Sequence, residues 1–212
     1  TDGFYGRDVR EKLQLSEGDP LWAHVSTLNS LERGYSLLKN NCIAQAVAGI
    51  ADNLRMRHSD IKMYEWTRTF HPDPTAENGT CTERAVLWAA ICGQARPTSW
   101  AGRERPADPW MLKGIVNDLA VELALPLTVA PADGSDPLSS CLHPNRQAVV
   151  LLDGQRVGVF GEIHPAIIEA HRIKRARPCY LELDADALIK PARRRGYVEP
   201  PVHQPIARSL AF

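Results

Sequence analysis

The sequence predicts an α+β fold in which helices flank an antiparallel β-sheet. One observation is a turn: Asp153-Gly154 separates two apolar runs, and Asp-Gly favours the tight turns that join antiparallel strands. The other is the order of the local signals along the chain, α-β-β-α-β-β-α-β, with a hairpin and long connections. A doubly wound parallel sheet would instead alternate strands and helices regularly.

Composition limits the size of the core and the classes of partner. The chain has 212 residues, of which 44% are hydrophobic, enough for one sizeable core or at most two small ones. Lys and Arg number 25, as do Asp and Glu, so no strongly basic field exists to gather RNA non-specifically. No apolar stretch approaches the roughly 20 residues that cross a bilayer, and no signal-peptide pattern is present. The five cysteines are odd in number and widely spaced, which predicts buried thiols in a reduced cytoplasmic protein.

The first half of the chain carries two helix signals and two strand signals. Apolar residues at steps of four and three predict a helix over 40–57, with Asn40 or Asn41 as its cap. The alternating run 61–70 predicts a strand, and 85–92, apolar on both faces, predicts a strand in the middle of the sheet. Asp108-Pro109 begins a second helix, because Asp accepts from free N–H groups and Pro suits the first turn; Pro126 stops it.

The second half begins with the hairpin 148–152 and 155–163. A helix follows from Pro165, then a strand over 179–184 and a short helix over 184–189. Residues 190–205 combine three arginines, Arg193, Arg194 and Arg195, with prolines, which is typical of an extended linker; binding to RNA backbone is the alternative. We therefore divide the chain into a lead-in segment (1–24), a main module (25–190), and a linker with the start of a further domain (191–212). Both ends read as cut from something larger.

Several groups of residues can be read functionally or structurally. Cys141, His143, His164 and His171 lack metal-site spacing, so we expect no metal. Close strand packing explains Gly158 and Gly161 better than a phosphate loop does, and helix capping explains Asp184 and Asp186 better than acid–base catalysis. Trp88, Trp100 and Trp110 could line a binding surface or pack in the core and at its edge; we expect Trp88 in the core and leave Trp100 undecided. The loop 95–107 combines Trp100 with Arg96, Arg103 and Arg105, which is either a solvated loop or a surface facing tRNA or another subunit.

Longer motifs carry a resemblance to a known family. VGVFGEIHPAIIEAHRI followed by CYLELDADAL resembles the β subunit of phenylalanyl-tRNA synthetase, as do CLHPNRQAVVLLDGQRVG and DIKMYEWTRTF upstream. DPWMLKGIVNDLAVELAL and PIARSLAF are similar to further segments of that family in the same order. The resemblance covers about 25–212 and departs from the family at NSLERGYSLLKNNCIAQAV, where a Pro and an Arg of the family pattern are missing.

The resemblance implies a class II aminoacyl-tRNA synthetase-like fold that has lost its chemistry. A class II site needs an Arg two positions before a Glu on one strand to hold the ATP α-phosphate, and here Met63 precedes Glu65. The helix that would carry a second Arg offers only His164, which is largely neutral at pH 7. We therefore expect no catalytic, cofactor-binding or metal-binding residue in this chain, while the whole enzyme would use ATP and Mg.

Two functions remain open at this point. The first is a structural module that binds the α subunit through 40–57 and the strand before it, within an (αβ)₂ ligase that charges tRNA with phenylalanine. The second is a repurposed paralogue that binds an amino acid, nucleotide or RNA in the old cleft. We also expect self-association if an apolar partner face is left uncovered, and no contact with membranes.

Overall fold

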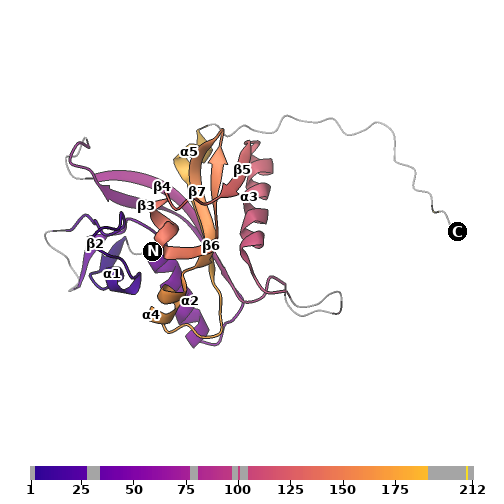
Figure 1. Ribbon diagram of the computed structural model, residues 1–212, viewed down its shortest axis with the longest axis horizontal. Coiled ribbons are helices and arrows are strands. Elements are labelled where there is room, and N and C mark those ends of the chain that lie inside the picture. The colour runs from indigo at the N-terminus through magenta and orange to yellow at the C-terminus, as the bar shows by residue number, and fades with distance from the viewer. Residues whose placement is uncertain are drawn as a thin grey trace.

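Two antiparallel β-sheets and five α-helices make up the described part of a computed structural model, which covers residues 3–27, 34–76, 81–96, 100, 105–190 and 209. The elements run in the order β1 Phe4–Gly6, α1 Val9–Lys12, β2 Tyr35–Leu38, α2 Ile43–Arg55, β3 Ile61–Pro72, β4 Cys81–Cys92, α3 Pro109–Leu123, β5 Leu127–Pro131, the 3-10 helix η1 Pro137–Cys141, β6 Leu142–Leu152, β7 Gln155–Ile163, α4 Pro165–Ala170, β8 Cys179–Asp184 and α5 Ala185–Ile189. Figure 1 shows their arrangement.

The main sheet has six strands in the order β3-β4-β8-β7-β6-β5, and each neighbouring pair is antiparallel. A small sheet of β1 and β2 lies beside it. The predicted α+β class with an antiparallel sheet flanked by helices is confirmed. The interior position predicted for 85–92 is confirmed as well, since β4 lies between β3 and β8.

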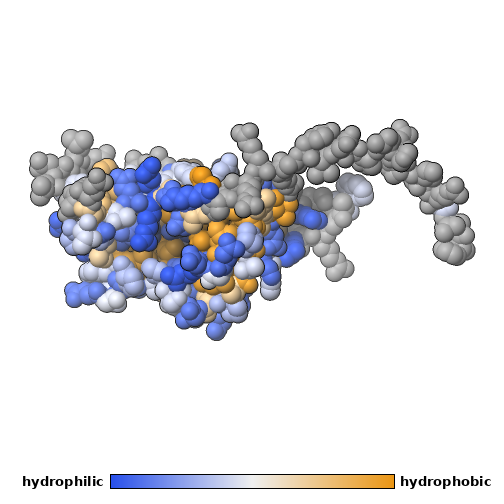
Figure 2. Space-filling view, turned by 90° about the horizontal axis from the view of Figure 1, so that it is seen from above, coloured by the Kyte–Doolittle hydropathy of each residue, from blue (hydrophilic) through white to orange (hydrophobic). Residues whose placement is uncertain are grey.

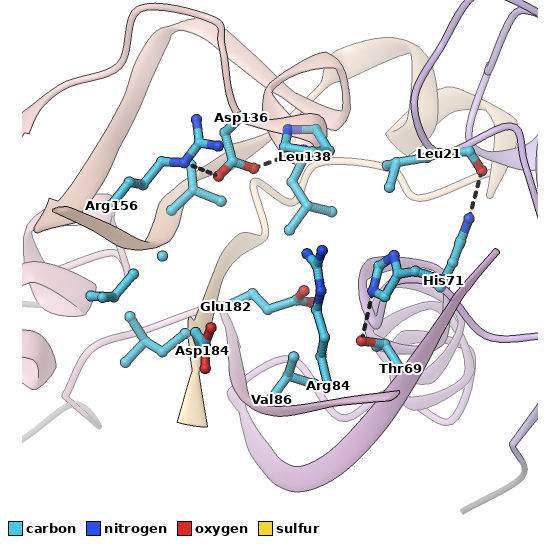
Figure 3. A pocket seen from close by; sticks show the side chains of 16 residues that line it. Leu21, Thr69, His71, Arg84, Val86, Asp136, Leu138, Arg156, Glu182 and Asp184 are labelled. Atoms are coloured by element: carbon cyan, nitrogen blue, oxygen red, sulfur yellow. Dashed lines mark hydrogen bonds and ion pairs between the residues drawn. The ribbon is translucent and has the colours of Figure 1, made fainter. Parts of the chain in front are cut away.

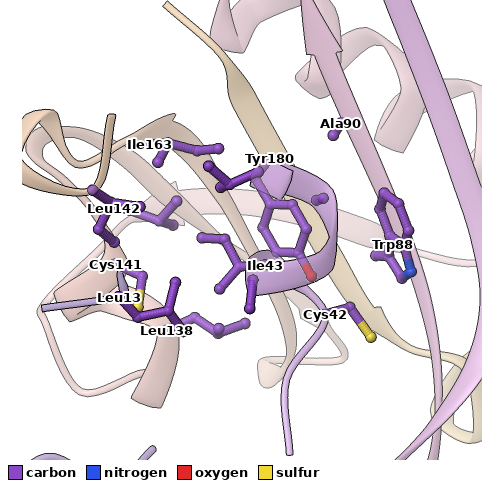
Figure 4. Packing of buried hydrophobic residues seen from close by; sticks show 14 of the residues in the cluster. Leu13, Cys42, Ile43, Trp88, Ala90, Leu138, Cys141, Leu142, Ile163 and Tyr180 are labelled. Carbon is purple, nitrogen blue, oxygen red and sulfur yellow. The ribbon is translucent and has the colours of Figure 1, made fainter. Parts of the chain in front are cut away.

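Two apolar cores lie on opposite faces of the main sheet. α2, α4 and the N-terminal elements pack on one face around Trp88 and Tyr180. Figure 4 shows these two rings together with Ile43 at the start of α2. α3 and α5 pack on the other face around Leu181 and Leu183. Seen from above, apolar side chains reach the surface in the middle of the molecule and hydrophilic ones border them (Figure 2).

The hairpin prediction rests on turn chemistry that the structure contains. Asp153 and Gly154 both have positive φ angles, of 50° and 79°, as a primed turn requires, and Leu152 pairs with Gln155 across it. Asp108 caps α3 by accepting a hydrogen bond from the Met111 N–H at 3.1 Å. Both elements therefore form where the sequence predicts them.

Of the two residues predicted to cap α2, Asn41 bonds to the first turn and Asn40 does not. The helix begins at Ile43 with Cys42 as its N-cap residue, and Asn41 Oδ1 accepts from the Ala44 N–H at 3.3 Å. The Asn40 side chain is used elsewhere: Oδ1 accepts from Asn41 Nδ2 at 2.8 Å, and Nδ2 donates to the carbonyls of Leu21 at 2.9 Å and Ala23 at 2.7 Å. Asn40 thereby holds the lead-in segment against the module.

The lead-in segment is itself structured. It contains β1 and α1, and its buried residues belong to the same core as α2; they are Tyr5, Val9, Leu13 and Leu21. The Tyr5 hydroxyl donates to the carbonyl of Asn41 at 2.8 Å, which joins β1 to the start of α2. The predicted domain boundaries stay predictions, and the predicted linker (191–212) lies outside the described residues apart from Ser209.

Candidate binding site

The two positions that class II chemistry would fill with arginines carry structural side chains instead. Met63 on β3 packs beside Gly49 of α2, whose ideal Cβ would lie 3.5 Å from the Met63 Sδ atom. The Glu65 carboxylate accepts from Gln45 Nε2 at 2.7 Å and from the Trp88 indole at 3.1 Å. Neutral donors of this chain therefore fix Glu65, and the uncharged Met63 cannot hold a phosphate.

His164, the second position, is the N-cap of α4. Its Nδ1 accepts from the Ala166 N–H at 3.2 Å, a geometry that requires the neutral tautomer with Nδ1 unprotonated. This hydrogen bond gives His164 a structural role at the start of α4. The expectation that the chain holds no catalytic residue stays a prediction.

The cysteine and histidines considered for a metal are engaged separately. Cys141 is fully buried, and burial raises the pKa of its thiol to about 12. Nδ1 of His143 accepts from the Asn145 N–H at 3.2 Å, while Nδ1 of His171 lies 2.9 Å from the Ile167 carbonyl. Within the described ranges, no group of three or more His, Cys, Asp or Glu residues could hold a metal. The absence of a metal stays a prediction.

The two glycines and Asp184 have the structural roles that the sequence favours. A Cβ at Gly158 would overlap the Glu182 carbonyl oxygen on β8, and one at Gly161 would lie 2.6 Å from the Arg146 oxygen on β6. Close strand packing is thus confirmed for both. Asp184 caps α5 by accepting from the Ala187 N–H at 2.9 Å, whereas Asp186 lies in the first turn of that helix.

The three tryptophans considered as binding residues lie in different environments. Trp88 is buried and stacks with Tyr180 at 6.2 Å between ring centroids, which confirms the core prediction. Trp110 is exposed at the start of α3, with the Lys113 ammonium 5.4 Å from its ring centroid. Trp100 is fully exposed, but most of its loop, including Arg103, lies outside the described residues. A tRNA-facing role for this loop stays a prediction.

Sequence reasoning missed a cavity of about 200 Å³ that opens between the β3–β4 hairpin and η1. β8 forms its floor, with Glu182 and Asp184, and β7 adds Arg156. Figure 3 shows Arg84 and His71 reaching into it from the hairpin. These residues are far apart in the sequence and share no motif, so only the register of β3, β4, β7 and β8 brings them together.

Glu182 is the most perturbed acid of this cavity. Its Oε2 accepts from the Tyr180 hydroxyl and from the Cys42 N–H at 3.3 Å, at the start of α2. Protein surrounds the side chain, and only the cavity gives it partial exposure. Burial raises the pKa of Glu182 to about 7, against the opposing effect of the two hydrogen bonds.

His71 and Arg156 are two further ionisable residues of the cavity lining. Half-buried His71 lies 3.0 Å from the Thr69 hydroxyl through Nε2, and burial, together with the nearby Arg84 cation, lowers its pKa to about 4. His71 is therefore neutral at pH 7. Arg156 is neutralised by Asp136, at 3.2 Å between Nε and Oδ2.

Comparison with known proteins identifies the family. The family model described as "Phenylalanyl tRNA synthetase beta chain CLM domain" matches residues 3–185. Curated relatives are named "Phenylalanine--tRNA ligase beta subunit". The one from Burkholderia lata is 29% identical over 217 residues, covering 95% of this chain and 26% of the relative. Those from Staphylococcus epidermidis (27% identity) and Dechloromonas aromatica (28%) cover 87% and 89% of this chain, and 21% and 23% of their own length.

The chain thus spans about a quarter of the length of these relatives. The match runs through the N-terminal elements, the main sheet and its helices, and ends within α5. None of the described helices is long and apolar enough to cross a membrane. The chain belongs to the family of the phenylalanyl-tRNA synthetase β chain CLM domain.

Proposed function

We propose that this chain is a non-catalytic structural module of a phenylalanyl-tRNA synthetase β subunit, which supports the α subunit in the ATP-dependent attachment of phenylalanine to its tRNA. The family match over residues 3–185 carries the proposal. In this view the antiparallel sheet is a class II synthetase-like sheet, ATP and Mg are used elsewhere in the assembled enzyme, and the protein works in the cytoplasm.

The residues on β3 support a structural role. In this chain α2 covers the face of β3 that carries Met63 and Glu65, and Gln45 on α2 donates directly to Glu65. Lys39, just after β2, donates to the Thr67 hydroxyl at 2.8 Å on the same face. A surface closed by the protein's own side chains has no room there for a nucleotide phosphate, which fits a module that positions other parts of an enzyme.

Co-expression with the α subunit of the same source tests the proposal. We expect the two chains to elute together on size-exclusion chromatography, and the full-length β subunit to support phenylalanine charging only when α is present. Recovery of α and this chain as separate species, together with charging by α alone, would contradict a supporting role and would favour the repurposed paralogue.

The exposed side of α2 is our proposed contact with α. It presents Ala48, Asp52, Arg55 and Met56, and the Met56 side chain is 72% exposed. Ala48→Glu and Met56→Asp should weaken the complex by about tenfold or more, as charges in an interface core do. Val121→Asp is the control, because Val121 is exposed on α3 on the opposite face of the sheet. If all three variants weaken the complex with the α subunit equally, α2 is not the contact surface.

A further inference from the structure

The cavity at the β3–β4 hairpin has both apolar and polar walls, with charged groups on its floor and rim. Leu21, Val86, Leu138 and Val159 supply apolar walls, while Glu182 lies on the floor and Arg84 on the hairpin side. Its volume of about 200 Å³ is below the roughly 300–1,000 Å³ of drug-sized pockets, so its occupant is a small molecule.

Arg84 differs from neighbouring arginines because it has no partner among the described residues. Arg68 on the other strand of the hairpin pairs with Glu83 at 3.0 Å, and Arg156 across the cavity pairs with Asp136. The Arg84 guanidinium can therefore give its N–H groups to a ligand. A planar guanidinium matches the two oxygens of a carboxylate or similar anion.

Glu182 offers the opposite charge to the same space. Both of its hydrogen bonds use Oε2, which leaves Oε1 without a partner among the described residues. Of the other ionisable groups, His71 is neutral, and Arg156 and Asp136 neutralise each other. Asp184, which caps α5, adds a second carboxylate to the floor on the side of Glu182. A purely anionic ligand would meet repulsion from Glu182, and a purely cationic one would meet repulsion from Arg84.

We propose that this cavity binds a small zwitterion with an apolar body, of the amino-acid class, whose carboxylate contacts Arg84 and whose ammonium contacts Glu182. The apolar walls of the cavity take the side chain of the ligand. This site is independent of the proposed contact with α, since its residues lie on β4 and β8 rather than on the exposed side of α2.

The test uses L-leucine and its two single-charge fragments, 4-methylpentanoate without the ammonium and 3-methylbutylamine without the carboxylate. Titration calorimetry and amide chemical shifts of the 212-residue chain are recorded at about pH 8, above the pKa of Glu182. We expect leucine to shift the amides of β4 and β8 around the cavity, and to bind about tenfold or more tightly than either fragment.

Single-residue variants test whether Arg84 and Glu182 bind the two charged groups of leucine. Arg84→Met and Glu182→Gln should each weaken leucine binding by about tenfold, whereas Arg68→Met, an arginine of the same hairpin that does not line the cavity, should leave it unchanged. Thermal unfolding of each variant checks that it is folded. Because Arg84 is exposed, Arg84→Met should fold, and it tests the proposal by itself if Glu182→Gln does not. Three outcomes overturn the proposal: no binding of leucine at millimolar concentration, equal binding of 4-methylpentanoate, or equal binding by folded Arg84→Met.

Discussion

Glu182 links three parts of the molecule through one carboxylate. It accepts from Tyr180 on its own strand and from Cys42 at the start of α2, and it borders the cavity. A buried carboxyl group is costly to ionise, so the proton is held to a higher pH than in the unfolded chain. Stability should therefore depend on pH through this residue.

The sign of that dependence follows from its pKa of about 7, against 4.5 for an ordinary Glu side chain. Between these values the native state binds more protons, so the contribution of Glu182 is full below 4.5 and is lost as the pH rises through 7. Glu182→Gln removes the effect. We expect the stability of Glu182→Gln relative to the wild type to increase by about 3 kcal/mol between pH 4.5 and 7, at about 1.4 kcal/mol per unit.

His71 acts in the opposite direction and makes the comparison with the wild type necessary. Its pKa of about 4 lies below the ordinary 6.5, so the native state binds fewer protons in that window and stability rises with pH. Urea unfolding of both proteins at several pH values between 4.5 and 7 measures the difference. A difference that does not change with pH would mean that Glu182 has the same pKa in the native state as in the unfolded chain.

Gly158 and Gly161 test close strand packing at single positions. Ala at either site would push a methyl group into the backbone of the neighbouring strand, β8 or β6, and we expect losses of about 1–3 kcal/mol. Gly114 in α3 is the control, because a Cβ there meets nothing within 4 Å and Ala favours a helix by about 1 kcal/mol. Chemical denaturation measures all three, and a neutral Gly158→Ala would show that β7 and β8 can separate without loss.

At the scale of elements, α3 depends on its N-terminal cap. Asp108 accepts from the Met111 N–H and pairs with Arg105 at 3.2 Å. Asp108→Ala should reduce the free energy of unfolding by about 1 kcal/mol, the usual contribution of a side-chain cap. Asp118→Ala is the matched change on an exposed position of the same helix, and it should leave stability unchanged or raise it slightly. Equal effects in urea unfolding would exclude the cap as the cause.

The elements also show where local signals suffice. α3, the β6–β7 hairpin and α5 form where their caps and turn residues predict, because those signals act over a few neighbouring residues. β1, α1, β2, β5 and η1 are short and carry weak periodicity, so they do not stand out from loops in the sequence. α2 begins at Ile43, later than predicted, and Asn41 rather than Asn40 bonds to its first turn, since the Asn40 amide contacts the distant Leu21 and Ala23.

At the scale of the whole molecule, the five cysteines report on global unfolding. All are free and buried, as the sequence predicts for a reduced protein. Burial raises the pKa of the Cys92 thiol to about 11 and that of the Cys179 thiol to about 12, so the reactive thiolate is scarce at neutral pH. Cys42 and Cys141 are also buried, with pKa values raised by the same cause.

We expect a disulfide reagent such as Ellman's reagent to modify Cys42, Cys92, Cys141 and Cys179 only as fast as the fold opens. The same chain in concentrated urea is the control and should react at all five positions within the mixing time. Rapid modification of these four thiols in the native protein, followed by mass spectrometry, would contradict a core that excludes solvent.

The sequence by itself determined the α+β class, the main hairpin, the caps of α3 and α5, the buried thiols and the family, because each depends on local chemistry or on contiguous motifs. Only the tertiary structure decided the six-stranded order, the packing of the lead-in segment on α2, and the cavity with Arg84 and Glu182. Strand order brings together residues that are about 100 positions apart, such as Arg84 and Glu182 at the cavity, and it sets the contacts between neighbouring strands. No local pattern encodes such contacts, since their free energy arises only when the whole sheet has formed.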